Sequence, residues 1–369
     1  MTAPTMLIGH GAVLERLEQA HREGALGHAL LLSGPTGVGK TTLALRLAES
    51  LLDAGRWPGG LAAHPDMWLE DSDAERVGID RIRAGARADV GPSLQDVMSL
   101  RTYAGGMRVA LLARAERLTE QAADALLKTL EEPPPATVII LCAANPEALP
   151  ATILSRAQQV PAATVAASRI VSWLEDAGIE PGLARLAAAL AGGRPGRALR
   201  LASQPGSLAG EVEALHAFLA VAGGGMDGAL RAAAELTPGP GAEGRERAMM
   251  LLAVWSSFVR DAALEADAIT ELRLWAGYAE PLQRWAESLG AGRLTGILGA
   301  LLRAASEIAQ YAQPRLTFET LFLDIFVGPE APPVVEIPPL PAGVGEAPAA
   351  VSGVAPASRG LPRRPARRR

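Results

Sequence analysis

The feature that most constrains the fold is a short apolar run followed at once by a glycine-rich loop and a helical pattern. The run is 29–32 (ALLL), the loop is 34–41 (GPTGVGKT), and the helical pattern continues over 42–48. An apolar run without alternating polar positions is typical of a strand buried on both faces, as in a parallel sheet. The loop fits the pattern G-x-x-x-x-G-K-[ST], whose backbone N–H groups surround phosphate oxygens. Because strand, loop and helix occur in the required order, the sequence predicts an α/β fold with a phosphate loop.

The residue types in this loop predict a nucleotide site. We expect Lys40 to reach the β- and γ-phosphates and the Thr41 hydroxyl to ligate Mg²⁺, with the helix N-terminus attracting anions. Lys40 is one of only two lysines among 35 basic residues, so a lysine stands where a compact ammonium is needed. A glycine-rich turn or a relic loop that binds nothing is the competing interpretation. The expected nucleotide-binding residues are Gly34, Pro35, Thr36, Gly37, Val38, Gly39, Lys40, Thr41 and Thr42.

Composition limits the other classes of protein. A length of 369 residues predicts two or three domains, and a net charge of −5 does not predict bulk attraction to nucleic acid. The single cysteine, Cys142, excludes a disulfide framework and a cysteine-based zinc site, and we expect it to be a small buried hydrophobe. No apolar run reaches membrane-spanning length and the first ten residues lack a signal pattern, so a cytoplasmic protein without a membrane partner is expected.

Further apolar runs predict the rest of a sheet. Buried strands are expected at 108–112 and 137–142, and a short extended segment at 64–69. Residues 146–160 are expected to lead out of the sheet. Helices are expected to start at 77–83 and to cover 120–132, where Thr119 is the N-cap and three prolines end the helix. Alternating strands and helices predict a parallel sheet with helices on both faces.

Four segments follow from these patterns. The predicted segments are an α/β phosphate-loop core at 1–160, a small helical lid at 161–205, an all-helical domain at 206–328 and a disordered Pro/Arg-rich tail at 329–369. Ten prolines in the last 41 residues leave too little apolar surface for folding. The arginine-rich end predicts either a solvated tail or a contact with nucleic acid or an acidic partner. His10, His21 and His28 are expected at the surface or at helix ends.

Three motifs in this order carry a family resemblance: the phosphate loop, 125–134 (ALLKTLEEPP) and 153–156 (ILSR). Together they resemble the bacterial replicative clamp loader, an AAA+ assembly within the DNA polymerase III holoenzyme. Shorter matching segments are LIGH at 7–10, HA at 28–29, HPD at 64–66 and RVA at 108–110. The resemblance implies an AAA+ core with a lid, and a helical collar for oligomerisation. It also implies ATP as cofactor, gamma/tau and delta subunits as partners in a heteropentameric ring, and a sliding clamp and primed DNA reached through the complex.

In this family each ATP lies between neighbouring subunits, and one subunit presents the arginine of a Ser-Arg-Cys motif to the next subunit's γ-phosphate. The matching residues here are Ser155, Arg156 and Ala157, so the resemblance implies that Arg156 is an arginine finger in trans. A fixed guanidinium stabilises the charge that develops on a transferred phosphoryl group. An ordinary surface ion pair is the alternative interpretation of Arg156.

Other positions depart from an active ATPase. The acidic pair expected after the second buried strand is replaced by Ala113 and Arg114, which neither order Mg²⁺ nor activate water. Glu116 lies two residues on, and whether it substitutes is open. No polar sensor follows Cys142, where 143–144 are alanines. The family's lid arginine falls on Gly196, flanked by Arg194 and Arg197, which leaves a rescue open.

The four-cysteine zinc module of the motor subunits is also missing from 53–64, so no zinc is expected. We therefore expect a subunit that holds ATP, does not hydrolyse it in cis, and supports hydrolysis in trans. Two alternatives remain: a motor-type, gamma/tau-like ATPase with a divergent acidic motif, and a structural ring adaptor whose phosphate loop is empty. No motif supports DNA polymerisation by this chain itself.

Overall fold

The chain forms two compact units in the computed structural model. The model describes residues 6–72, 74–85, 91–103, 106–204, 206–239, 241–270, 273, 275, 278–310 and 312–337. The described residues within 6–173 and 193–197 belong to the first unit, and those within 174–192 and 198–337 belong to the second. The predicted lid segment at 161–205 therefore contributes residues to both units.

The first unit is built on a five-stranded parallel sheet with the order β2-β3-β4-β1-β5. Its strands are β1 (Ala29–Ser33), β2 (Met67–Glu70), β3 (Arg108–Leu112), β4 (Thr137–Ala143) and β5 (Gln158–Pro161). All residues of β3 and β4 are buried, as expected for strands covered on both faces. Because all neighbours run parallel, the carboxyl ends of β1, β3 and β4 meet at one edge.

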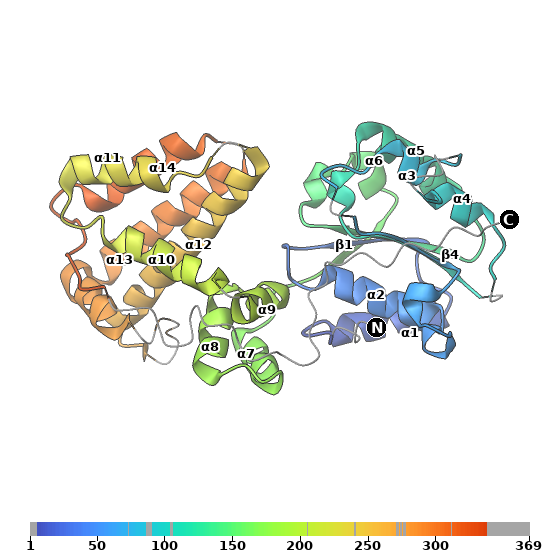
Figure 1. The fold of residues 1–369 in the computed structure, drawn as a ribbon, viewed down its shortest axis with the longest axis horizontal. Coiled ribbons are helices and arrows are strands. Elements are labelled where there is room, and N and C mark those ends of the chain that lie inside the picture. Colours follow the sequence, from blue (N-terminus) through green and yellow to red (C-terminus); the bar gives the residue numbers. More distant parts are fainter. Residues whose placement is uncertain are drawn as a thin grey trace. The chain divides into compact units, whose positions relative to one another are not determined.

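Helices cover both faces of this sheet, as the alternating pattern predicts (Figure 1). On one face, α1 (Gly11–Arg22) and α2 (Lys40–Leu51) pack on Leu30 and Leu32. The other face includes Leu31 and is covered by α3 (Ile79–Ile82), α4 (Leu94–Ser99), α5 (Glu120–Glu131) and α6 (Ala151–Leu154). Successive strand residues point to opposite faces, so one short apolar run supplies both halves of the core. Four 3₁₀ turns complete the unit: η1 (Ala54–Arg56), η2 (Leu61–Ala63), η3 (Ala115–Arg117) and η4 (Pro146–Ala148).

The predicted strands and the predicted α5 are confirmed, with one correction. Thr119 caps α5, because its side chain accepts a hydrogen bond from the Ala122 N–H. Residues 146–160 do not simply lead out of the sheet, since 158–161 form the edge strand β5 beside β1. The sequence signal for β5 is weak because Val160 is its only buried residue. The helix predicted to start at 77–83 is the single turn α3.

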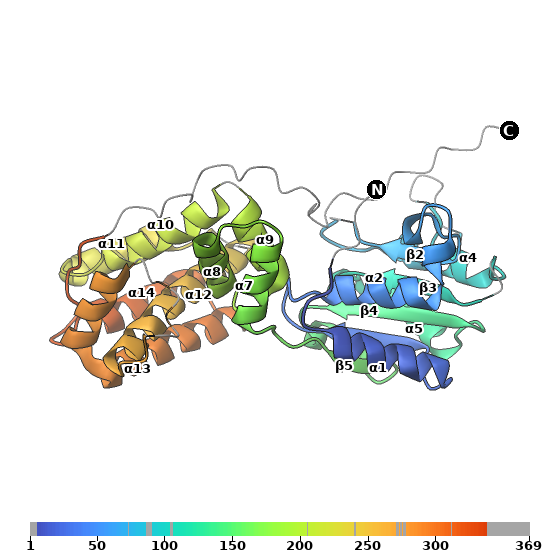
Figure 2. The ribbon, with the colours of Figure 1, turned by 90° about the horizontal axis from the view of Figure 1, so that it is seen from below.

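The second unit is a bundle of helices (Figure 1; Figure 2). It contains α8 (Pro181–Leu190), α10 (Ser207–Leu219), α11 (Gly225–Leu236), α12 (Gly241–Ala266), α13 (Ala279–Ala309) and α14 (Pro314–Phe326). Two further helices, α7 (Ala167–Asp176) and α9 (Pro195–Ser203), each contribute residues to both units. A left-handed residue, Gly290 at φ 66°, breaks α13 into two helical parts.

The core of the second unit is aromatic. Phe218 of α10 stacks on Trp255 of α12, with their ring centroids 5.0 Å apart. Phe318 and Phe322 of α14 pack on Trp255 from another side. The helical stripes of the sequence are thus buried bundle core.

Part of the predicted tail is placed in the structure. Residues 329–337 follow α14, and Val335 among them is buried. The remainder, 338–369, lies outside the described residues. Within the described part of the chain, no helix has both the length and the apolar composition needed to cross a membrane.

Candidate functional site

The phosphate loop lies between β1 and α2, at the carboxyl edge of the sheet. Gly34, Gly37 and Gly39 have φ angles of 148°, 83° and 112°, which favour glycine. A Cβ at Gly34 would also lie 2.4 Å from the Ala162 carbonyl oxygen, so no other residue fits there. The three glycines therefore set the path of the loop.

The remaining loop residues occupy distinct places. Pro35 and Thr36 are exposed at the tip, and Val38 is fully buried beneath it. Thr41 and Thr42 are half-buried in the first turn of α2, where backbone N–H groups have no intrahelical acceptor. This arrangement presents open donors and the positive end of a helix at the loop.

The side chain of Lys40 folds back over the loop. Its Nζ donates to the carbonyl oxygens of Gly34 at 2.6 Å and Pro35 at 3.1 Å. Burial lowers the pKa of Lys40, while the nearby Cys142 and Glu116 oppose that shift. An ammonium that donates to two neutral carbonyl oxygens, beside open N–H donors, fits an anionic phosphate group.

His10 supports the loop from behind. Its Nε2 lies 3.0 Å from the Val38 carbonyl oxygen, and the residue is only 2% exposed. His10 occupies the N-cap position of α1, but its side chain is buried and makes no capping bond, so the expected surface or capping role is wrong for this histidine. The sequence carries no local signal for this contact, which spans 28 residues.

The start of α9 packs directly on the loop within the first unit. The Gly196 N–H donates to the Gly37 carbonyl oxygen at 2.8 Å. A Cβ at Gly196 would lie 3.1 Å from that oxygen, and a Cβ at Gly37 would lie 3.2 Å from the Arg197 nitrogen. The glycine at the family's lid-arginine position thus permits a close backbone contact. The neighbouring Arg197 is buried.

The expected gap in acidic residues lies at the end of β3. The Ala113 N–H donates to the Glu70 carbonyl oxygen at 2.9 Å, which continues the pairing of β3 with β2. Arg114 forms an ion pair with Asp71, with 3.0 Å between Nη2 and Oδ1. The charge of Arg114 is therefore directed toward Asp71, a partner that sequence reasoning missed.

Glu116, in η3, has one buried oxygen. Its Oε2 receives no hydrogen bond within the described part of the chain. The charge of Glu116 acts on both Lys40 and Cys142. A buried acceptor without a donor is costly, so this atom marks a place that a ligand or water would satisfy.

Cys142, near the end of β4, lies close to the polar side chains of the phosphate-loop region. Burial raises the pKa of its thiol to about 12. The charges of Lys40, Glu116 and Asp71 and the Thr41 side chain have smaller effects on the pKa of this thiol. Cys142 is thus a small buried hydrophobe, as predicted. Several polar groups of the loop region lie near its thiol.

Arg156 follows α6 on the surface, with 37% of its side chain exposed. Its Nη2 lies 2.7 Å from Glu131 Oε1, and its Nη1 donates to the Thr152 carbonyl oxygen at 3.0 Å. In the single chain Arg156 therefore makes a surface ion pair with the end of α5. Glu131 is half exposed, so the pair is open to exchange.

Two of the shorter resemblance segments have a structural explanation. Asp66 and Arg108 form a buried ion pair, with Oδ1 and Nη2 3.0 Å apart. Asp66 also accepts from the Tyr103 N–H, at 2.9 Å for Oδ1. The Asp66 N–H in turn donates to His64 Nδ1 at 3.2 Å. These residues hold β2 beside β3 and lie away from the phosphate loop.

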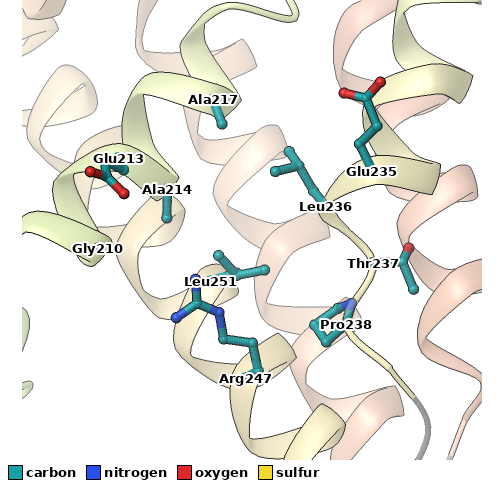
Figure 3. A pocket seen from close by; sticks show the side chains of 10 residues that line it. All are labelled: Gly210, Glu213, Ala214, Ala217, Glu235, Leu236, Thr237, Pro238, Arg247 and Leu251. Carbon is teal, nitrogen blue, oxygen red and sulfur yellow. The ribbon is translucent and has the colours of Figure 1, made fainter. Parts of the chain in front are cut away.

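A pocket with a volume of about 350 Å³ lies in the helical unit. It is lined by α10, α11 and α12, with Glu213, Glu235 and Arg247 among apolar side chains such as Leu236 and Leu251 (Figure 3).

Among the described residues of the whole chain, no three His, Cys, Asp or Glu side chains form a group able to hold a metal.

The strand order, the phosphate loop and the two helical layers define an AAA+-type α/β domain followed by a helical region. Residues 9–165 match the family model described as "DNA polymerase III, delta subunit". The delta-prime subunit of Pseudomonas aeruginosa is 37% identical over 193 residues, which are 48% of this chain and 56% of that protein. The tau subunit of Escherichia coli is 35% identical over 160 residues, which are 42% of this chain and 24% of that protein.

Residues 9–165 are thus similar to delta-prime and tau clamp-loader subunits of DNA polymerase III, and these matches do not separate delta-prime from tau. The chain spans about half the length of the delta-prime relative and a quarter of the tau relative. A solved DNA polymerase III gamma subunit-related protein of Thermotoga maritima is 20% identical, with a TM-score of 0.39. That alignment covers 84% of this chain and 97% of that one.

Proposed function

We propose that this chain is the delta-prime subunit of the DNA polymerase III clamp loader. In this proposal it is a hydrolysis-deficient AAA+ subunit of a cytoplasmic heteropentameric ring. Its partners are the gamma/tau and delta subunits, and the ring loads the sliding clamp onto primed DNA. The relatives and the family model over 9–165 support a clamp-loader subunit, and the missing carboxylates at 113–114 favour delta-prime over tau.

The observation that carries this proposal is a complete phosphate loop beside a strand end without carboxylates. Lys40 and the first turn of α2 face the place for phosphates, whereas Ala113 and Arg114 follow β3. Hydrolysis needs a carboxylate that orders Mg²⁺ and another that activates water. A chain built in this way binds ATP without hydrolysing it efficiently.

The residues present fit ATP with Mg²⁺. Gly34 to Gly39 supply a curled backbone, Lys40 supplies a positive charge, and the Thr41 hydroxyl lies in the first turn of α2. Bound Mg²⁺ would neutralise phosphate charge there. The chain itself supplies the remaining contacts at the site. The loop would hold the phosphates, and α9 contacts the loop through Gly196.

Arg156 is the proposed contribution to a neighbouring site. Its guanidinium is partly exposed, and exchanging the Glu131 ion pair for a γ-phosphate costs little because surface pairs are weak. In a dry interface the same guanidinium stabilises the transferred phosphoryl group. The chain would thus promote hydrolysis by its neighbour.

Substitution of Arg156 in a reconstituted complex tests this role. We expect Arg156→Ala to lower DNA-dependent ATP turnover and clamp loading by 10²-fold or more, in line with arginine fingers of other ATPases and GTPases. Arg46→Ala is a matched control, since Arg46 also makes a surface ion pair, 3.0 Å from Glu49, at similar exposure. Wild-type rates for Arg156→Ala would refute the role in trans.

Two measurements address the alternatives. Appreciable ATP hydrolysis by the isolated chain, lost in Lys40→Ala, would instead indicate a motor-type ATPase. Titration of wild type and Lys40→Ala with nucleotide tests the adaptor alternative, in which neither protein binds. The proposal requires binding by wild type, weakening by Lys40→Ala and negligible turnover.

A further inference from the structure

Glu116 is the one acidic side chain of the β3 turn whose carboxylate is partly buried without a donor. Its Oε2 has no hydrogen bond among the described residues, and η3 follows Ala113 and Arg114 directly in the chain. An ionised oxygen in this state is unfavourable unless a charged or protic group satisfies it. The proposed function assigns nothing to Glu116.

The strand register places Glu116 beside the phosphate loop. Leu112 of β3 pairs with Leu141 of β4, and Leu32 of β1 pairs with Cys142. The turn after β3 and the loop after β1 therefore emerge on either side of the end of β4. Burial dominates the raised pKa of the Cys142 thiol, and both the charge of Glu116 and the side chain of Thr41, at the start of α2, also act on that pKa. Thr41 and Glu116 therefore both lie near the Cys142 thiol at the end of β4.

Thr41 is the residue expected to contact Mg²⁺, so the carboxylate lies on the metal side of the site. Mg²⁺ in such sites keeps several waters and takes only one or two carboxylates beside the phosphates. A carboxylate in the second layer accepts hydrogen bonds from those waters. The carboxylate expected at 113–114 is missing. Glu116 supplies a carboxylate two residues further along the chain, and its Oε2 accepts no hydrogen bond from the described residues.

We propose that Glu116 takes over the Mg²⁺-ordering role left open at Ala113 and Arg114, by accepting hydrogen bonds from water on the metal. This inference rests on the proposed nucleotide binding, and it concerns binding rather than hydrolysis. The Asp71 carboxylate is already paired with Arg114, at 3.0 Å between Oδ1 and Nη2. The site would therefore order the metal and still lack a base.

A simpler role for Glu116 would be to balance the charge of Lys40 in an empty loop. The two roles predict opposite effects of Glu116→Gln. If Glu116 orders the metal, the variant binds ATP more weakly in Mg²⁺. If it only offsets Lys40, the variant binds ATP equally or more tightly with and without Mg²⁺, because a negative charge near the phosphates is gone.

The experiment is calorimetric titration of the full chain with a non-hydrolysable ATP analogue, in Mg²⁺ and in EDTA. We expect Glu116→Gln to weaken binding in Mg²⁺ by about 10- to 100-fold, the value of a hydrogen bond to a charged group. In EDTA we expect unchanged or tighter binding. Glu147→Gln is the control, because Glu147 is exposed in η4 of the same unit, and it should match wild type.

Each result decides between the claims. Equal Mg²⁺ dependence in Glu116→Gln and wild type would overturn the inference while leaving nucleotide binding intact. Failure of wild type to bind in either buffer would overturn the proposed ATP binding, and with it the role of Glu116. Glu116→Asp retains the charge on a shorter side chain, so partial recovery of the Mg²⁺ dependence would exclude misfolding as the cause.

Discussion

The buried Asp66–Arg108 ion pair offers the sharpest test of what holds the first unit together. The two side chains are about 1% and 4% exposed, and their charged atoms are 3.0 Å apart. Arg108 also donates to main-chain carbonyl oxygens, including that of Arg101 at 2.5 Å. Asp66→Ala removes the carboxylate that pairs with this guanidinium while leaving the guanidinium buried.

The expected cost follows from burial. Removing one partner of a buried pair destabilises a protein by about 3–5 kcal/mol, because the remaining charge is uncompensated. The Tyr103 N–H loses its acceptor as well. With a urea dependence of roughly 2 kcal/mol per M, the unfolding midpoint of the first unit should fall by about 2 M.

Cys142 provides an assay for this unit alone. It is the single cysteine of the chain and is fully buried in the first unit, and burial raises the pKa of its thiol to about 12. A pulse of thiol reagent at pH 8 therefore labels unfolded molecules only. The fraction labelled against urea concentration measures unfolding of this unit separately from the helical bundle.

A matched control isolates the effect of burial. Asp53 and Arg56 also lie 3.0 Å apart, but their side chains are 66% and 87% exposed. Asp53→Asn should leave the midpoint nearly unchanged. Equal midpoints for Asp66→Ala and Asp53→Asn would refute the reasoning, and the double change Asp66→Leu with Arg108→Met should recover much of the loss.

Three further predictions concern single residues. Thr119→Ala should cost about 1 kcal/mol by removing the cap of α5, seen as a lower labelling midpoint of Cys142. Gly196→Ala should lower the same midpoint, since its Cβ would lie 3.1 Å from the Gly37 carbonyl oxygen, and should weaken ATP binding measured by calorimetry. Burial lowers the pKa of His216 below its usual 6.5, so the unfolded chain takes up the proton first. Stability of the helical unit, followed by tryptophan fluorescence, should therefore fall as pH drops below about 6.5, and less so in His216→Gln.

Much of the first unit could be read from local pattern. The strands at β1, β3 and β4 are runs of apolar residues long enough to be recognised without neighbours, and the Thr119 cap precedes its helix directly. The sequence did not predict the edge strand β5, because Val160 is its only buried residue. Its strand conformation depends on pairing with β1. A strand that is buried on both faces of the sheet can therefore be predicted from its local sequence, whereas a short edge strand cannot.

The sequence alone determined which groups are available for chemistry: a phosphate loop with Lys40, no carboxylate at 113–114, and Arg156 after α6. Only the tertiary structure decided which of them meet. It set His10 under the loop, Gly196 against Gly37, and Arg114 on Asp71. The physical reason is that hydrogen bonds and ion pairs act over a few ångströms, and only the folded sheet brings residues so far apart in the chain within that range.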